Sequence, residues 1–272
     1  MHTEEKYPLR QALPPDTADL WLCPTDGLDL NACARKYLPL LNAEEKGRYD
    51  RYRFDKDKLL HLLAHVLKRD LLSRYLGGRP ESWKFQKNEY GKPDIENNPS
   101  EPPLRFNLSH TKGMVVCGLS QAGPVGVDVE SEKRRSDFLG ICDRFFSQSE
   151  TTALRALEPG EQRARFLSCW TLKESYMKAL GKGITIPLDS FSFDLDSEAE
   201  RISVTIDGEN EEETRRWRFA LMQVEALHWV SISLRARSAD RECHIRAFSV
   251  RPFQSARKAS CRLVASSEHC RI

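Results

Sequence analysis

Two long segments of the chain carry hydrophobic residues at helical spacing. In residues 54–76 the leucines and valine form a wide apolar stripe, the pattern of a helix buried in the core. Gly77 and Gly78 follow it, and glycine is the residue that most readily closes a helix. Residues 161–180 repeat this pattern and stop at Gly181. We therefore expect two long core helices, one in each part of the chain.

A shorter helix is predicted before each long one. Asn42 can cap a helix that starts at Ala43, with Glu45 in the third helical position. Ser147 and Glu150 offer the same capping-box pattern to a helix over residues 147–157. Each of the two long helices is thus expected to follow a capped short one.

Apolar runs of strand length follow each helical region. We predict strands at residues 20–23, 105–108, 114–120, 125–130, 190–194, 202–206, 217–224, 229–234 and 243–250. The turn at residues 121–124 divides the chain, so we expect an N-terminal α+β half over 1–122 and a C-terminal α+β half over 123–253. Residues 254–272 are rich in serine and basic residues and are predicted to form a loose, dispensable tail.

Composition excludes several classes of protein. The chain has 272 residues, of which 40% are hydrophobic and 30% charged, so it is neither disordered nor collagen-like. A net charge of +2 argues against nucleic-acid binding, which needs many phosphate contacts. No apolar run reaches the roughly 18 residues of a membrane span. The first ten residues lack the apolar stretch of a signal peptide, so we expect a cytoplasmic protein whose eight cysteines stay reduced.

Four clusters could carry chemistry, and each has a plainer explanation. Asp128 and Glu130 alternate with valines, so both carboxylates face one side of a strand, where a hard cation such as Mg²⁺ could bind. An ordinary solvent-facing strand edge explains that spacing equally well. Glu174 and Lys178 are neighbours one helical turn apart, near further lysines and a Gly-x-Gly turn that suggest phosphate binding. The alternative for them is an ion pair on the helix surface.

The third cluster is Asn107-Leu108-Ser109-His110-Thr111, which offers hydrogen-bond donors to phosphate or sugar oxygens, or else stabilises a local turn. Adjacent strand residues face opposite sides, which argues against a serine–histidine hydrolase. The fourth is a basic stretch over residues 46–58 that reads as an exposed helix start. His61 and His65, one helical turn apart, are interpreted as structural because no glutamate follows His61 as in zinc proteases.

Together and in this order, these segments resemble the Sfp-type 4′-phosphopantetheinyl transferase family. The resemblance covers roughly residues 40–250. It rests on Tyr90-Gly91-Lys92-Pro93, on residues 106–110, on residues 126–130 and above all on residues 170–183 (Trp-Thr-Leu-Lys-Glu-Ser-Tyr-Met-Lys-Ala-Leu-Gly-Lys-Gly). Arg53-Phe54-Asp55-Lys56-Asp57 before the first long helix is similar to the N-terminal half of that family.

The resemblance implies an α+β fold of two similar halves related by a pseudo-twofold axis, with the active site in the cleft between them. It implies transfer of the 4′-phosphopantetheine arm of coenzyme A to a serine of an apo acyl or peptidyl carrier protein, releasing adenosine 3′,5′-bisphosphate. The related holo-acyl-carrier-protein synthases are half this length and trimeric, so a monomer is expected here. Carriers of fatty-acid, polyketide and non-ribosomal peptide synthesis are all open as partners.

The resemblance also implies roles for single residues. Glu174, Lys178 and His110 are the expected catalytic residues, with Glu174 or a water that it holds as the base. Asp128, Glu130 and Glu174 are the expected ligands of Mg²⁺, or of Mn²⁺ in its place. Binding of coenzyme A is expected to fall to Lys56, Lys87, Gly91, Lys92, Asn107, Ser109, His110, Asp128 and Lys178.

Two further expectations concern partners. A carrier protein is expected to dock on residues 137–146, where Phe138, Leu139 and Phe145 lie among arginines, unless these aromatic residues belong to the core. A Mg²⁺-dependent nucleotide pyrophosphohydrolase would use the same carboxylates with water as the nucleophile, and it remains the alternative activity.

Overall fold

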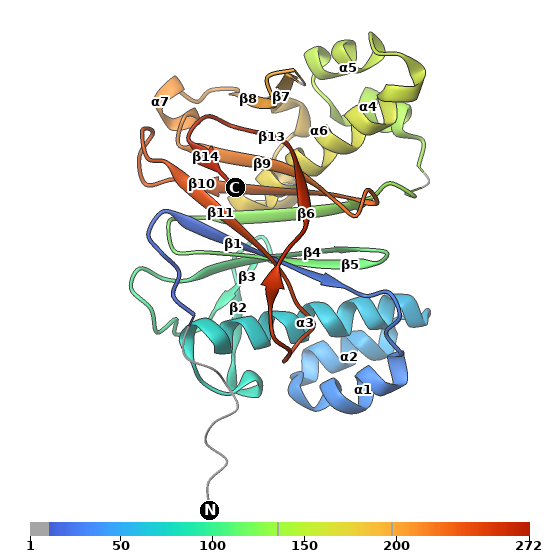
Figure 1. Ribbon diagram of the computed structural model, residues 1–272, viewed down its shortest axis with the longest axis vertical. Helices are drawn as coiled ribbons and strands as arrows, with labels where there is room; N and C mark the ends of the chain where they lie inside the picture. Colours follow the sequence, from blue (N-terminus) through green and yellow to red (C-terminus); the bar gives the residue numbers. More distant parts are fainter. Residues whose placement is uncertain (1–10, 135, 197) are drawn as a thin grey trace, which may run out of the picture.

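The structure, a computed structural model, describes residues 11–134, 136–196 and 198–272. Within these residues the chain forms four layers: helices, a six-stranded sheet, a second six-stranded sheet, and helices again (Figure 1). The sheets face each other in the middle of the molecule, and the helices cover their outer faces. This α+β arrangement of two similar halves confirms the fold class predicted from the sequence.

The N-terminal half contains a sheet in the order β12-β11-β1-β5-β4, with β14 beside β11. Its strands are β1 (Thr17–Pro24), β4 (Arg105–Thr111), β5 (Met114–Ser120), β11 (Cys243–Ser249), β12 (Arg257–Lys258) and β14 (Cys270–Arg271). Three helices cover the sheet: α1 (Leu30–Tyr37), α2 (Ala43–Arg51) and the 22-residue α3 (Asp55–Leu76). A separate hairpin is made of β2 (Phe85–Lys87) and β3 (Pro93–Ile95).

The second sheet has the order β6-β10-β9-β13-β8-β7. Its strands are β6 (Val125–Ser131), β7 (Phe191–Asp196), β8 (Arg201–Ile206), β9 (Trp217–Val224), β10 (His228–Arg235) and β13 (Cys261–Ser266). Its helices are α4 (Phe138–Phe145), α5 (Gln148–Arg155), the 22-residue α6 (Pro159–Leu180) and the short α7 (Glu211–Thr214). Short 3₁₀ turns lie at Leu38–Leu40, Pro80–Ser82, Gly183–Thr185 and Leu188–Ser190.

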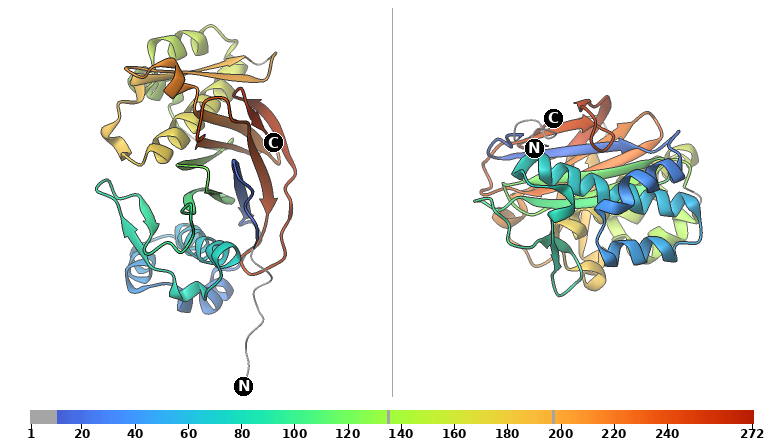
Figure 2. Two further views of the ribbon diagram at one scale, coloured as in Figure 1. Left: turned by 90° about the vertical axis from the view of Figure 1, so that its left-hand side faces the viewer. Right: turned by 90° about the horizontal axis from the view of Figure 1, so that it is seen from below.

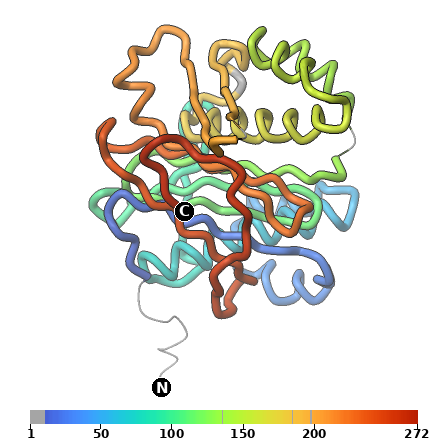
Figure 3. The backbone as a smooth tube through the Cα atoms, turned by 45° about the horizontal axis from the view of Figure 1, so that its top comes forward, coloured from blue at the N-terminus to red at the C-terminus, as the bar shows by residue number. Residues whose placement is uncertain are grey.

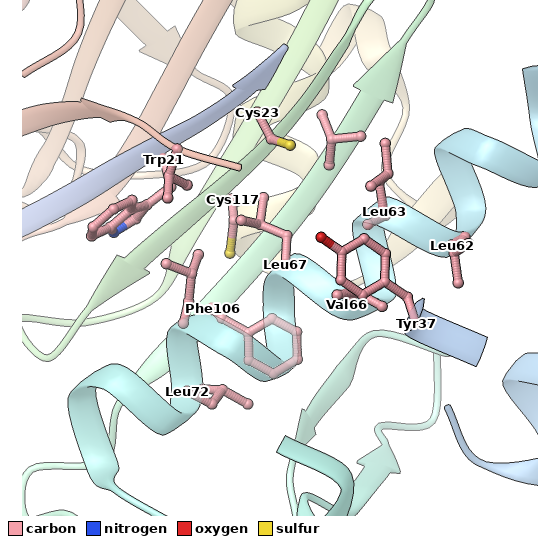
Figure 4. Close-up of a cluster of buried hydrophobic side chains, with 14 of the residues drawn as sticks. Trp21, Cys23, Tyr37, Leu62, Leu63, Val66, Leu67, Leu72, Phe106 and Cys117 are labelled. Carbon is pink, nitrogen blue, oxygen red and sulfur yellow. The ribbon is translucent and has the colours of Figure 1, made fainter. Parts of the chain in front are cut away.

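Three apolar clusters hold these layers together. One lies between α3 and the first sheet, where Leu63, Leu67 and Phe106 meet Trp21 (Figure 4). A second lies between α6 and the second sheet, and a third fills the space between the two sheets. Both sheets are therefore buried on two faces, which explains why a strand such as β5 reads as a nearly continuous apolar run.

The predicted capping boxes at Asn42 and Ser147 are confirmed. In each, the cap side chain accepts a hydrogen bond from the backbone of the third helical residue, and that glutamate bonds back to the cap. The glutamates themselves, Glu45 and Glu150, are 6% and 4% exposed, so they reach into the core rather than into solvent. The acidic stretch after Gly208 contains the short helix α7, which Asn210 caps.

The prediction of a loose tail after residue 253 is wrong. β13 pairs with β9, β14 pairs with β11, and Ala265 and Cys270 are buried. This segment has too few apolar positions to show helical or strand periodicity in the sequence. Its strands form by pairing with strands of both sheets. Figure 3 shows this last segment, in dark red, crossing over strands of both sheets.

The predicted division of the chain into two halves also differs from the structure. β11 belongs to the N-terminal sheet, where it runs parallel to β1, although the sequence places it in the C-terminal half. The final segments therefore tie the two halves together, as the strands along one side of Figure 2 (left) show. Within the described residues, no helix is both long enough and apolar enough to cross a membrane.

Two glycines allow the layers to approach closely where the halves meet. A Cβ on Gly118 of β5 would lie 2.6 Å from the Val127 side chain of β6. A Cβ on Gly126 of β6 would overlap the backbone of α6 at Ser175 and Ala179. Any larger residue at Gly126 would push α6 away from the strand that carries Asp128 and Glu130.

Candidate active site

A cavity of about 530 Å³ opens between the two halves. The N-terminal half contributes side chains from α2, α3 and β4, and the C-terminal half contributes side chains from β6 and α6. The polar and aromatic residues that line it are Arg48, Tyr52, His61, His65, Ser109, His110, Asp128, Glu130, Arg134, Trp170, Glu174 and Lys178. The structure thus brings together the clusters that the sequence had placed far apart.

Asp128 lies at the centre of one wall. Its Oδ1 accepts hydrogen bonds from Ser109 Oγ at 2.8 Å and from Lys178 Nζ at 2.5 Å, and Lys178 also donates to Ser109 Oγ at 3.0 Å. These three side chains come from β6, β4 and α6, so each of the three elements must be in place for the contact to form. The plainer reading of Lys178, a surface ion pair with Glu174, is wrong: within the described residues, Lys178 pairs with Asp128.

Two further carboxylates share the cavity with Asp128. Burial, with the nearby Asp128 charge, raises the pKa of Glu130 to about 7. Burial also raises the pKa of Glu174, and Asp128 adds to the rise while Lys178 opposes it. Because both carboxyl groups are buried away from solvent, each stays protonated to a higher pH than an ordinary glutamate does. The raised pKa makes Glu174 a stronger base than an ordinary glutamate.

The acidic wall fits a divalent cation that brings other ligands with it. Asp128 Oδ2 is buried and has no hydrogen-bond partner, which is costly unless a cation or a ligand contacts it. Among the described residues, however, no three histidine, cysteine, aspartate or glutamate side chains converge closely enough to hold an ion by themselves. A Mg²⁺ bound here would need oxygens from a phosphorylated ligand, which is its usual mode of binding.

The opposite wall comes from α2 and α3. Arg48 supplies a cation, and the rings of Tyr52, His61 and His65 form a row, with centroids 5.3 Å and 4.4 Å apart. His110 lies beside it at the end of β4, and loss of solvent together with the Lys178 and Arg48 charges lowers the pKa of His110. The cavity therefore has an acidic wall, an aromatic wall and basic groups at both.

Several residues expected at the site lie elsewhere. Lys92 donates to the backbone oxygens of Ala179 at 3.0 Å and Val125 at 3.3 Å, so it holds the β2–β3 hairpin against the end of α6. Gly91 forms the turn of that hairpin, at φ +87°. Asn107 accepts a hydrogen bond from the backbone nitrogen of Val127 at 2.9 Å and so joins β4 to β6.

The two remaining lysines are exposed. Lys56 lies at the start of α3 beside the Phe54 ring, and Lys87 pairs with Glu44. Neither lines the cavity. By contrast, Arg48, Tyr52, His65, Arg134 and Trp170 line it and were not predicted. Arg48 was only one of several basic residues in its stretch, and which of them faces the cavity depends on how α2 packs on α3.

Comparisons with known proteins point to one family. The family model described as "4'-phosphopantetheinyl transferase superfamily" matches residues 124–247, and "4'-phosphopantetheinyl transferase, N-terminal" matches residues 32–121. The chain is similar to 4′-phosphopantetheinyl transferase Sfp of Bacillus subtilis, with 36% identity over 59% of this chain and 69% of the relative. It is 31% identical to 4′-phosphopantetheinyl transferase HetI of Nostoc sp., over 67% of this chain and 76% of the relative.

The matches leave part of each chain uncovered. A relative from Synechocystis sp. is 36% identical over 61% of this chain, and the match spans 65% of that relative's length. The solved structure of Thermotoga maritima holo-[acyl-carrier-protein] synthase covers 43% of this chain with a TM-score of 0.34 and 20% identity. That structural likeness is too slight to place any residue.

Proposed function

The chain belongs to the 4′-phosphopantetheinyl transferase superfamily, and we propose that it transfers the 4′-phosphopantetheine arm of coenzyme A to a serine of an apo carrier protein. The observation that carries this proposal is the arrangement of Asp128, Lys178 and Glu174 in one cavity between the halves. Adenosine 3′,5′-bisphosphate is the second product.

The charges of the cavity suit both substrates. Coenzyme A carries a pyrophosphate and a 3′-phosphate, so its site must offset several negative charges. Arg48 and Lys178 can contact these phosphates from opposite walls of the cavity. Ser109 holds Asp128 in place through its hydroxyl, so we assign it to positioning the acidic wall.

In the proposed reaction, the carrier serine hydroxyl gives its proton to Glu174 and its oxygen attacks the phosphorus next to the pantetheine arm. A new P–O bond forms as the bond to the departing nucleotide breaks. Lys178 then stabilises the charge that builds on the leaving phosphate. The raised pKa of Glu174, caused mainly by burial, favours its acceptance of the serine proton.

Mg²⁺, or Mn²⁺ in its place, is the proposed metal. Asp128 and Glu130 would hold it, and Glu174 would contact it from α6; when bound, the ion offsets phosphate charge and polarises the phosphorus. The unpartnered Asp128 Oδ2 supports this assignment. Lys92 lies outside the cavity, and its ammonium group donates to the backbone at the end of α6. We therefore propose that Lys92 holds the two halves closed over the ligand and does not contact the ligand directly.

The proposed enzyme is a monomer of the cytoplasm. All eight cysteines are free thiols, which suits a reducing compartment. For the carrier we propose a surface on α4, where Phe138 and Phe145 pack against Phe166 and Trp170 but stay partly exposed.

The proposal is tested by incubating the protein with coenzyme A, Mg²⁺ and a panel of apo carrier proteins, with intact-mass detection. We expect one carrier or more to gain the mass of one phosphopantetheine on its serine, and the serine-to-alanine carrier to gain none. Release of free 4′-phosphopantetheine without carrier modification would instead identify a pyrophosphohydrolase. No turnover of coenzyme A with any carrier would refute the proposal.

A further inference from the structure

The cavity wall on α3 contains a carboxylate–histidine pair that the proposed reaction does not use. His65 Nδ1 lies 2.9 Å from Glu45 Oε1, and His61 Nε2 lies 2.9 Å from the backbone oxygen of Glu45. Glu45 is itself buried and held by Lys68 at 3.1 Å and Arg69 at 2.7 Å. A single buried residue thus fixes the orientation of both imidazole rings.

These contacts determine where each ring carries its proton. A ring nitrogen 2.9 Å from a carboxylate or carbonyl oxygen donates to it, so we assign the proton of His61 to Nε2 and that of His65 to Nδ1. Lys68 Nζ also lies near His65 Nδ1, but at the longer distance of 3.3 Å, and it donates to Glu45 as well. Burial lowers the pKa of His65 to about 4, and burial also lowers the pKa of His61. Both rings are therefore neutral at pH 7, and each has one nitrogen with a free lone pair.

His65 is the ring that a ligand can reach. Its side chain is 25% exposed and lines the cavity, whereas His61 is 4% exposed. No hydrogen bond to His65 Nε2 occurs within the described residues, and this atom is not among their buried unsatisfied atoms. The lone pair of Nε2 is thus free to accept a hydrogen bond from a ligand in the cavity that His65 lines.

We infer that His65, oriented by Glu45, accepts a hydrogen bond from the nucleoside of the bound nucleotide and thereby contributes to substrate specificity. This inference rests on the proposed function, because it takes coenzyme A as the ligand. An acceptor cannot bind a phosphate oxygen, so it must face a part of the ligand that carries N–H or O–H groups. The adjacent rings of Tyr52 and His61, tilted by 48° to each other, add aromatic surface against which a base can pack.

Two groups of the nucleoside could donate to Nε2: the exocyclic amine of adenine and the ribose 2′-hydroxyl. The probe is adenosine 3′,5′-bisphosphate, which lacks the pantetheine arm, compared by calorimetry with its inosine and 2′-deoxyadenosine counterparts. We expect the wild type to bind one of the two counterparts about 3- to 10-fold more weakly, the usual worth of one hydrogen bond. Which counterpart loses affinity identifies the donor.

The variants decide whether His65 is responsible. His65→Phe keeps a ring but has no acceptor, so it should bind the two nucleotides that the wild type distinguishes with about equal affinity. His65→Gln retains an acceptor and should recover part of the difference in affinity. His244→Gln, a change at an exposed histidine far from the cavity lining, is the control and should discriminate like the wild type. Thermal unfolding of each variant shows whether it is folded.

Other outcomes overturn the inference. It is wrong if the wild type does not distinguish the three nucleotides, or if His65→Phe distinguishes them as well as the wild type does. Either result leaves carrier modification, measured by mass, unaffected and refutes only the role of His65. Failure to bind both adenosine 3′,5′-bisphosphate and coenzyme A would refute the inference together with the proposed function.

Discussion

Helices α3 and α6 hold equivalent places in the two halves, yet only α6 carries the glutamate that we propose as the base. Each is 22 residues long and follows a short helix with a capping box. In each, a buried lysine pairs with the capping-box glutamate: Lys68 with Glu45 at 3.1 Å and Lys173 with Glu150 at 2.8 Å. The pair fixes the short helix to the long one in both halves.

The two helices differ in what surrounds this shared pair. On α3 the next residue, Arg69, is buried and adds a second cation to Glu45, and the cavity receives the neutral rings of His61 and His65. On α6 the next residue, Glu174, faces the cavity together with Lys178. Under the proposed function, one scaffold would serve two tasks, with ligand recognition on α3 and proton transfer on α6.

The largest effect should come from breaking the connection between the halves. Removal of residues 255–272 deletes β13, which lies between β9 and β8, and also β12 and β14, which pair with β11. We expect this variant to aggregate or unfold, because buried β9 and β11 would each lose pairing on one side. Solubility and circular dichroism measure it. A soluble variant with wild-type melting would show that each half is stable without these strands.

Glu174→Gln should separate the task of α6 from that of α3. Loss of a general base typically lowers a rate by about 10²- to 10⁴-fold. We expect such a loss in carrier modification, with nucleotide affinity near wild type because Arg48 and the α3 rings remain. Glu161→Gln on the exposed start of α6 is the matched control. Transfer by a folded Glu174→Gln variant at near wild-type rate would remove Glu174 from the chemistry.

The two buried lysines should differ in how much stability they supply. Lys173→Met leaves Glu150 buried with no other cation within ion-pair distance among the described residues, which should cost about 3–5 kcal/mol. Lys68→Met leaves Glu45 paired with Arg69 and His65, so we expect only about 1–2 kcal/mol. Urea unfolding compares them, with exposed Lys84→Met as the control. Equal losses would mean that the additional partners of Glu45 do not compensate.

The pH dependence of metal activation should follow Glu130. Its pKa of about 7 lies above the ordinary value, so Glu130 takes up a proton as the pH falls through 7 and then binds Mg²⁺ poorly. Between pH 8 and pH 6 we expect the apparent affinity for Mg²⁺ to fall about tenfold. Glu130→Gln should flatten this dependence, whereas His65→Phe should leave it unchanged. A steep dependence in Glu130→Gln would assign it to another group.

The smallest effect concerns carrier docking on α4. Arg144 is exposed beside Phe145, and Arg144→Glu should raise the KM for an acidic carrier several-fold without changing the KM for coenzyme A. Arg134, also expected on this surface, pairs with Glu130 in the cavity and so cannot test docking alone. Arg135 lies outside the described residues. Parallel changes in both KM values would argue against a docking role.

Much of the fold was predictable because its signals are local. The apolar periodicity of α3 and α6, the two capping boxes and the alternation in β6 each depend on residues close in the chain. The same alternation correctly put Asp128 and Glu130 on one face, since side-chain direction in a strand is fixed by the backbone. Resemblance to a known family added the cleft between the halves.

What remained depended on contacts between distant residues. Local spacing predicted an ion pair between Lys178 and Glu174. In the fold, β6 places Asp128 Oδ1 at 2.5 Å from Lys178 Nζ, and the lysine pairs with Asp128 instead. Lys92 was expected to bind phosphate, but its ammonium group donates to the backbone oxygen of Ala179 at the end of α6. Residues 254–272 carry few apolar positions, and their order comes from pairing with distant strands: β13 lies between β9 and β8, and β14 pairs with β11. The sequence determined the elements and their faces; only the packing of the two halves decided which charges meet, because charge pairing depends on distance in space.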